Sequence, residues 1–293
     1  MKHIHFILNS IAGKGNNNLD LKLINKYFDK SDYHVVIKPT FYKKHAIKLT
    51  QASITEEADI VVACGGDGTI NEVASCLVST SIPLGIIPLG SGNGLTSNLN
   101  IPKNIESALE IIKNNTIKKI DVGLLNQHYF FSNSGIGFDA QVIKHYEASR
   151  KRTLSSYIKA TIKSLKKTDI LTEVETTFNN TTLLHKPFLI FISNSNQMGY
   201  NVSLTPKASL IDGKLDILIA PKLNTLKIAL FTILMFFKKH HILKEVEIHQ
   251  TKEIKITQNN KQLFQIQLDG EFLMIKGNSI QISVLEKAIN VIA

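Results

Sequence analysis

A chain of 293 residues is longer than one small hydrophobic core usually organises, so its length favours two domains. Apolar residues make up 43% and charged residues 20%, which excludes a disordered chain and is typical of a globular protein. The formal net charge of +10 favours either an anionic partner, such as a nucleotide, a membrane surface or a nucleic acid, or simply high solubility.

The first part of the chain alternates short apolar strands with amphipathic helices. In chain order we predict a strand at 5–8, a helix at 19–28, a strand at 33–38, a helix at 44–55, a strand at 60–63, a helix at 70–78, a strand at 84–87 and a helix at 105–114. This alternation predicts a parallel sheet of the α/β class.

From about residue 120 the pattern changes to paired strands joined by turn residues. Strands are predicted at 121–125, 129–132, 170–178, 188–193, 215–220, 246–257, 264–268 and 280–285, with helices inserted near 141–167 and 223–243. We therefore expect an α/β + β fold, with an α/β domain in residues 1–120 and an antiparallel β-sandwich domain in residues 121–293. The last residues could also pack back on the first domain.

One turn in the α/β half carries the clearest chemical signal. Residues 60–75 read IVVACGGDGTINEVAS, so three glycines and an acid join a buried strand to a helix. Backbone N–H groups at a helix N-terminus bind phosphate, and glycines let the backbone come close and adopt φ > 0. An acid there repels phosphate unless a cation lies between them, so Asp67 indicates a divalent metal with a nucleoside triphosphate. The alternative is a tight turn with a helix-capping Asp.

Other short motifs occur before and after this turn. They are Asn9-Ser10-Ile11-Ala12-Gly13-Lys14, Thr40 with His45-Ala46, Pro88-Leu89-Gly90-Ser91-Gly92-Asn93-Gly94, Asp212-Gly213 and Asp269-Gly270-Glu271. Together with GGDGT followed by N-E-V, they resemble in order the motifs of the diacylglycerol kinase catalytic-domain family. That family comprises bacterial lipid kinases and their sphingosine and ceramide kinase relatives, and the resemblance covers nearly the whole chain.

The resemblance implies that ATP binds in a cleft between the two domains, with its phosphates on the glycine loop. Carried over to this chain, the nucleotide-binding residues are Asn9, Ser10, Ala12, Gly13, Lys14, Thr40, Gly65, Gly66, Asp67, Gly68, Thr69, Ile70, Asn71 and Ser91. Asp67 would also organise the catalytic Mg²⁺. The alternative for residues 91–94 is a second surface turn.

For the second domain the resemblance implies a structural Mg²⁺ and a general base. The metal would be held by Asp212 and the backbone carbonyls of Ser209 and Lys214, where the alternative is a type I turn. Glu271 would accept the proton of the lipid hydroxyl, and Asp269 would support the metal network. An acid pair flanking a glycine is equally a good hairpin turn.

The acceptor lipid is left open by one departure from the family pattern. Bacterial diacylglycerol kinases usually show N-D-F or N-E-F after the P-L-G loop, whereas Asn93 is here followed by Gly94-Leu95. This form is more similar to the sphingosine and ceramide kinase branch.

Two segments of the second half indicate a membrane surface. Residues 144–167 hold eight Lys or Arg and one Glu, a net +7, which favours anionic headgroups or merely a solvated helix. Residues 228–237 are strongly apolar but too short for the ~20 residues that span a bilayer, so they form an interfacial helix or, as we favour, buried core.

The sequence thus predicts an ATP- and Mg²⁺-dependent lipid kinase, cytoplasmic and peripheral to the inner membrane face. No secretory signal is visible, no nucleic-acid partner is expected, and a homodimer remains open. Two alternatives stand: a kinase of a soluble acceptor, similar to NAD kinases, and a non-catalytic nucleotide- or lipid-binding regulator.

Overall fold

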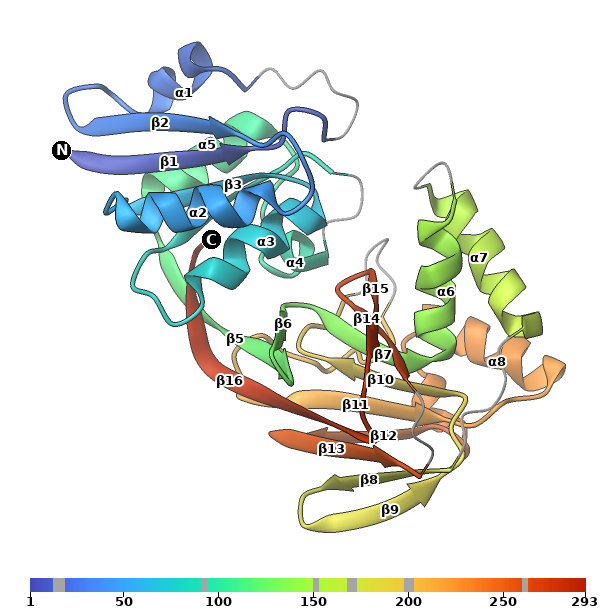
Figure 1. Ribbon diagram of the computed structural model, residues 1–293. Coiled ribbons are helices and arrows are strands. Elements are labelled where there is room, and N and C mark those ends of the chain that lie inside the picture. The colour runs from blue at the N-terminus through green and yellow to red at the C-terminus, as the bar shows by residue number, and fades with distance from the viewer. Residues whose placement is uncertain (13–18, 91–93, 150–152, 168–172, 198–202, 260–262) are drawn as a thin grey trace. The chain divides into compact units, whose positions relative to one another are not determined.

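The computed structural model describes residues 1–12, 19–90, 94–149, 153–167, 173–197, 203–259 and 263–293 (Figure 1). The chain divides into two compact units. Unit 1 comprises Met1–Val122 with Glu286–Ala293, and unit 2 comprises Gly123–Leu285.

Unit 1 is built on a parallel sheet in the order β2-β1-β3-β4-β16. Its strands are β1 (Lys2–Leu8), β2 (Tyr33–Pro39), β3 (Ile60–Gly65), β4 (Leu84–Pro88) and the end of β16 (Ser279–Ile292), which pairs with β4 at Val291 and Leu84. Every residue of β3 and β4 is buried, because helices cover a parallel sheet on both faces.

Five helices belong to unit 1 among its described residues. They are α1 (Leu21–Tyr27), α2 (His45–Thr55), α3 (Asp67–Leu77), α4 (Gly94–Asn98) and α5 (Ile105–Asn114). Helix α2 packs with α3, and α1 packs with α5, as Figure 1 shows. The short helix α4 was not expected from the sequence.

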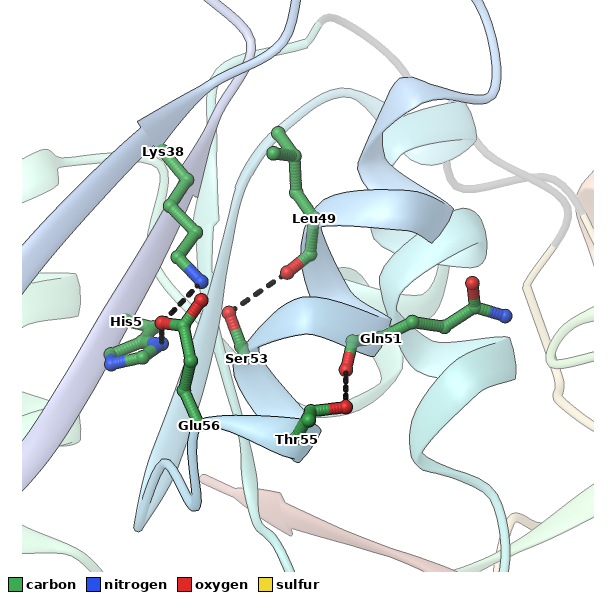
Figure 2. Close-up of polar contacts among 7 residues, drawn as sticks. All are labelled: His5, Lys38, Leu49, Gln51, Ser53, Thr55 and Glu56. Carbon is green, nitrogen blue, oxygen red and sulfur yellow. Dashed lines mark hydrogen bonds and ion pairs between the residues drawn. The ribbon is translucent and has the colours of Figure 1, made fainter.

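The end of α2 is tied to the sheet by an ion pair. Figure 2 shows Glu56, the C-cap of α2, accepting a hydrogen bond from Lys38 Nζ of β2 at 2.8 Å, with His5 Nδ1 of β1 at 3.8 Å. Within the helix, Ser53 and Thr55 donate their hydroxyls to carbonyls four residues earlier. Burial, and next the Lys38 charge, lower the pKa of His5, so a neutral imidazole packs beside this pair.

Unit 2 is a sandwich of two antiparallel layers. One layer is a six-stranded sheet in the order β12-β11-β10-β7-β14-β15: β12 (Glu247–Thr251), β11 (Leu215–Ala220), β10 (Leu189–Ser193), β7 (Asn133–Gly137), β14 (Phe264–Leu268) and β15 (Glu271–Ile275). The other contains β13 (Glu253–Gln258), β8 (Val174–Phe178), β9 (Thr181–His185) and the first part of β16, with β5 (Ile117–Leu125) and β6 (His128–Phe130) alongside. Alternate apolar residues of both layers form one core, among them Ile190, Ile217, Ile254 and Ile266.

The sandwich differs from the sequence expectation at several strands. The predicted strand at 246–257 is two strands, because a bend at Lys252 sends β12 to one sheet and β13 to the other. Strands β7 and β15 were not expected, and β16 is much longer than the predicted 280–285.

Three α-helices and a short 3₁₀ helix complete the described part of unit 2. They are α6 (Phe138–Glu147), α7 (Leu154–Lys167), α8 (Thr225–Phe236) and η1 (His240–Ile242). Helix α6 packs on β7, β14 and β15 and against α7, so it covers the face of the six-stranded sheet that points away from the sandwich core. None of the described helices is both long and apolar enough to cross a membrane.

Candidate functional site

The candidate nucleotide residues of unit 1 meet at the carboxyl ends of its parallel strands. The pairing register places Leu8, Pro39 and Cys64 in one row, so Asn9, Thr40 and Gly65 form the next row. Backbone hydrogen bonds hold this edge, from Asn9 N to the carbonyl of Cys64 at 2.9 Å and from Thr40 N to that of Leu8 at 2.8 Å. Ligands of open α/β sheets bind at this edge.

The glycine turn links the end of β3 to the first turn of α3. The Asn9 side chain donates its amide to the hydroxyl of Thr69 at 3.0 Å. A Cβ at Gly65 would lie 2.6 Å from Cβ of Thr69, so only glycine allows that approach. The expectation that these glycines adopt φ > 0 was wrong, since Gly65, Gly66 and Gly68 all lie outside that region. Close packing, rather than a left-handed backbone, explains Gly65.

The N-terminus of α3 has no capping side chain among the residues that the structure describes. Its N-cap is Gly66, which has no side chain, and a Cβ added at Gly68 would meet no atom of the described residues within 4 Å. Asp67 lies in the first turn and accepts a hydrogen bond from Gly94 N at 3.2 Å. Backbone N–H groups and the helix dipole suit a phosphate group, and a first-turn carboxylate suits its Mg²⁺. These residues therefore fit ATP with a divalent metal.

The remaining unit 1 candidates fall into three groups. Ser10 and Ala12 follow Asn9, with Ala12 N bonded to the Asn9 carbonyl at 3.1 Å. Ile70 is 2% exposed and packs into the core, whereas Asn71 accepts the hydroxyl of Ser75 at 3.3 Å. Gly13, Lys14 and Ser91 lie outside the described residues.

The second set of candidates lies on the hairpin that joins β14 to β15. Leu268 pairs with Glu271, and Asp269 and Gly270 form the turn with φ of +45° and +82°, the signs required by a type I′ turn. The Asp269 carboxylate accepts three consecutive backbone N–H groups, from Phe131, Ser132 and Asn133, at 2.7, 2.8 and 3.0 Å. Asp269 thus fixes the turn to the loop before β7, which positions the half-buried Glu271 at the start of β15.

A buried polar layer behind this hairpin was not found from the sequence. Gln267 is 2% exposed, donates its amide to Asn133 Oδ1 at 2.7 Å and accepts Gly270 N at 2.9 Å. Asp139, in the first turn of α6, also hydrogen-bonds Gln267, and a Cβ at Gly135 would lie only 2.1 Å from its Oδ2. Burial raises the pKa of Asp139 to about 7. The only signal in the sequence was a glutamine inside an apolar strand.

The expected structural metal site lies on the loop before β11. The Asp212 carboxylate accepts Lys214 N at 3.1 Å, and Ser209 Oγ accepts Ile211 N at 3.4 Å. The bond from Lys214 N to Asp212 belongs to a local turn, and the Asp212 carboxylate with the carbonyls of Ser209 and Lys214 would offer Mg²⁺ the oxygen ligands that a hard cation prefers. Asp216 of β11 pairs with Ser193 of β10, which pairs with Asn133 of β7, the strand next to β14. The loop before β11 and the Asp269 turn after β14 therefore lie at the same edge of the six-stranded sheet. Asp216 and Asp269 lie three strand spacings apart along this edge, or roughly 14 Å.

The fold and the glycine turn define a two-domain protein with a nucleotide-type α/β unit and a β-sandwich unit, and comparison with known proteins agrees. Residues 3–125 match the diacylglycerol kinase catalytic domain, and residues 133–293 match the YegS C-terminal NAD kinase beta sandwich-like domain. The chain therefore belongs to the diacylglycerol kinase catalytic-domain family, with a YegS-type C-terminal domain.

Individual relatives match over most of the chain. The chain is 27% identical to a diacylglycerol kinase of Bacillus subtilis over 277 residues, covering 93% of this chain and 90% of the relative. It is also 27% identical to an uncharacterized protein of Synechocystis over 305 residues, covering 99% of this chain and 70% of that protein. A crystal structure of a diacylglycerol kinase from Bacillus anthracis superposes with a TM-score of 0.76 at 22% identity, covering 99% of this chain and 96% of the other, which supports the fold.

Proposed function

We propose that this protein is an ATP- and Mg²⁺-dependent lipid kinase, which transfers the γ-phosphoryl group to a hydroxyl of a diacylglycerol-like or sphingoid lipid. Its family membership supports a phosphotransferase. The observation that carries the nucleotide assignment is the N-terminus of α3, where the N-cap is Gly66, no described residue lies within 4 Å of a Cβ built at Gly68, and Asp67 lies in the first turn.

In this proposal the chain's own groups bind, orient and accept a proton. The backbone N–H groups of the glycine turn hold the phosphates, and Asn9 fixes Thr69 beside them. Bound Mg²⁺ would neutralise charge that develops during phosphoryl transfer, and Asp67 would hold it on the nucleotide. Glu271 accepts the proton of the lipid hydroxyl, because Asp269 already accepts three backbone N–H groups and positions the turn.

Peripheral contact with the inner membrane face belongs to the same proposal. Helix α7 places Lys159, Lys163 and Lys166 beside the exposed side chains of Ile158 and Ile162. Each lysine near an anionic surface contributes about 1 kcal/mol to binding. We therefore expect the triple change of these lysines to Glu to weaken binding to anionic vesicles, and added salt to weaken wild-type binding likewise.

One glycine variant, Gly68→Ala, tests the nucleotide site. Gly68→Ala should leave the folded state stable or slightly more stable, because its Cβ would meet no described residue within 4 Å and Ala favours a helix by about 1 kcal/mol. The same methyl group occupies the space proposed for phosphate, so ATP affinity measured by calorimetry should fall. If Gly68→Ala binds ATP as tightly as the wild type, phosphate does not bind at this turn.

Transfer of labelled phosphate from [γ-³²P]ATP over a total lipid extract tests the reaction. Label in the chloroform phase supports a lipid kinase, and its absence from Asp67→Asn serves as the control. A new labelled compound in the aqueous phase, separated from ATP and inorganic phosphate by chromatography, would indicate a soluble acceptor, as in NAD kinases. No transfer despite ATP binding would indicate a non-catalytic regulator.

A further inference from the structure

Helix α8 exposes an apolar face of unusual extent. None of its residues is buried, and Leu226, Ile233 and Phe236 are 82%, 56% and 74% exposed. Phe237, its C-cap, is 70% exposed, and Leu230 is 45% exposed. The interpretation of this segment as buried core was therefore wrong for the outer face. Contiguous exposed apolar surface of this kind marks an interaction site.

This outer face does not take part in holding the helix on unit 2. The inner side of α8 packs through Phe231, Leu234 and Met235 on a core that includes Phe191 and Leu218 of the six-stranded sheet. The exposed residues Leu226, Leu230, Ile233 and Phe237 follow the i, i+4, i+7, i+11 spacing of one helix face. Polar residues would be expected there in a helix that faces water alone.

The C-terminus of α8 sets two lysines directly beside the exposed aromatics. Lys239 N donates to the carbonyl of Leu234 at 2.8 Å, and Lys238 N to that of Met235 at 2.9 Å, which is the Schellman pattern. Lys238 adopts φ of +56°, a conformation that glycine adopts at lower cost. The chain therefore keeps a charged residue here at some cost in stability.

Basic residues outnumber acidic residues around this face. Residues 221–244 contain five lysines and no Asp or Glu. Lys227 forms an ion pair with Glu245, and Lys222 lies 5.8 Å from the ring centroid of Phe188. Apolar side chains ringed by lysines match a bilayer that carries anionic headgroups. A second copy of this chain would bring lysines against lysines, so self-association is the poorer match.

We propose that the outer face of α8, with Phe236, Phe237, Lys238 and Lys239 at its end, inserts into the interface of an anionic lipid bilayer. The phenylalanines and Leu226, Leu230 and Ile233 enter the boundary between headgroups and acyl chains, and the lysines contact anionic headgroups. This inference deepens the lipid kinase proposal, because it names the surface through which the protein would contact the membrane. The biological purpose of the surface rests on the lipid kinase proposal, whereas the binding to lipid does not.

The chain has no tryptophan, which makes a direct test simple. Phe236→Trp creates a single emitter on the proposed surface, and Leu184→Trp creates a matched control on β9, where Leu184 is 61% exposed. With phosphatidylglycerol/phosphatidylcholine vesicles, emission from position 236 should shift to the blue and be quenched by brominated acyl chains. Emission from position 184 should neither shift nor be quenched. Vesicles of phosphatidylcholine alone should give a smaller shift and less quenching at position 236.

Two further variants measure the strength of the contact by vesicle sedimentation. Phe236→Ser with Phe237→Ser should weaken binding by roughly 100-fold, since burying each ring contributes about tenfold. Lys238→Gly should weaken it about fivefold without lowering the melting temperature, because glycine suits the left-handed backbone. Circular dichroism of each variant checks the fold.

The outcomes separate this surface from the proposed reaction, because no step needs ATP. Insertion at position 236 without lipid phosphorylation would support the surface and count against the kinase. Phosphorylation of detergent-dispersed lipid with no vesicle response at position 236 would overturn the surface alone. A blue-shifted, concentration-dependent signal without vesicles would overturn it in favour of a second copy.

Discussion

Replacing Asp139 by Asn should make unit 2 more stable at neutral and alkaline pH. Asp139 is 5% exposed, its Oδ2 has no hydrogen-bond partner among the described residues, and a Cβ at Gly135 would lie only 2.1 Å from that oxygen. Its titratable neighbour on α7 is Tyr157, whose pKa is raised by burial and then by the charge of Asp139. An ionised carboxylate is costly in this environment, whereas an amide of the same shape carries no charge at any pH.

The magnitude follows from linkage. The pKa of Asp139 is raised from 3.8 to about 7, so the folded state holds this proton more tightly than the unfolded state. Below pH 4 both states are protonated and the group costs nothing. Between pH 4 and 7 only the unfolded state ionises, so stability falls as pH rises, by about 4 kcal/mol in total at roughly 1.4 kcal/mol per unit.

The assay is thermal unfolding of the wild type and Asp139→Asn at intervals from pH 4 to pH 8. The difference between their melting temperatures should grow with pH by roughly 10 °C and level off above pH 7. Other carboxylates titrate in both proteins and cancel. Asp216→Asn is the matched control: burial also raises the pKa of Asp216, but Gln250 donates to both its oxygens, so its effect should be smaller. A difference independent of pH would refute the reasoning.

Three further predictions concern the proposed site. Asp67→Asn should lower lipid phosphorylation more than about 100-fold at saturating Mg²⁺ while leaving the fold intact by circular dichroism, and near-normal turnover would remove Asp67 from the mechanism. Glu271→Gln should lower kcat by about 10²–10⁴ with ATP affinity unchanged, whereas Asp269→Asn should also lower the melting temperature because it weakens three backbone hydrogen bonds. If Asp269→Asn instead lowered kcat alone and Glu271→Gln lowered the melting temperature, Asp269 would be the general base and Glu271 the structural residue. Gly65→Ala should cost about 1–3 kcal/mol of unfolding free energy in urea titrations, since its Cβ would lie 2.6 Å from that of Thr69, and an unchanged midpoint would contradict the packing argument.

Local pattern determined the fold class, which is confirmed by the family match and by the structure. Short apolar runs that alternate with segments of helical periodicity predicted the parallel sheet. Strand and helix periodicities can be read from the sequence because each depends only on residues that are near one another along the chain. The glycine turn was found for the same reason, since it joins one strand directly to the next helix.

Tertiary structure decided what depends on residues far apart in sequence. Gln267 meets Asn133 across 134 positions, and Asp269 meets Phe131 across 138, so no local window could pair them or predict β7. The exposure of α8 was likewise undetermined, because a helix that is apolar on nearly every side has no polar face to indicate which side meets water. Only the packing of Phe231, Leu234 and Met235 on the sheet decides which face is inside and leaves Phe236 and Phe237 outside.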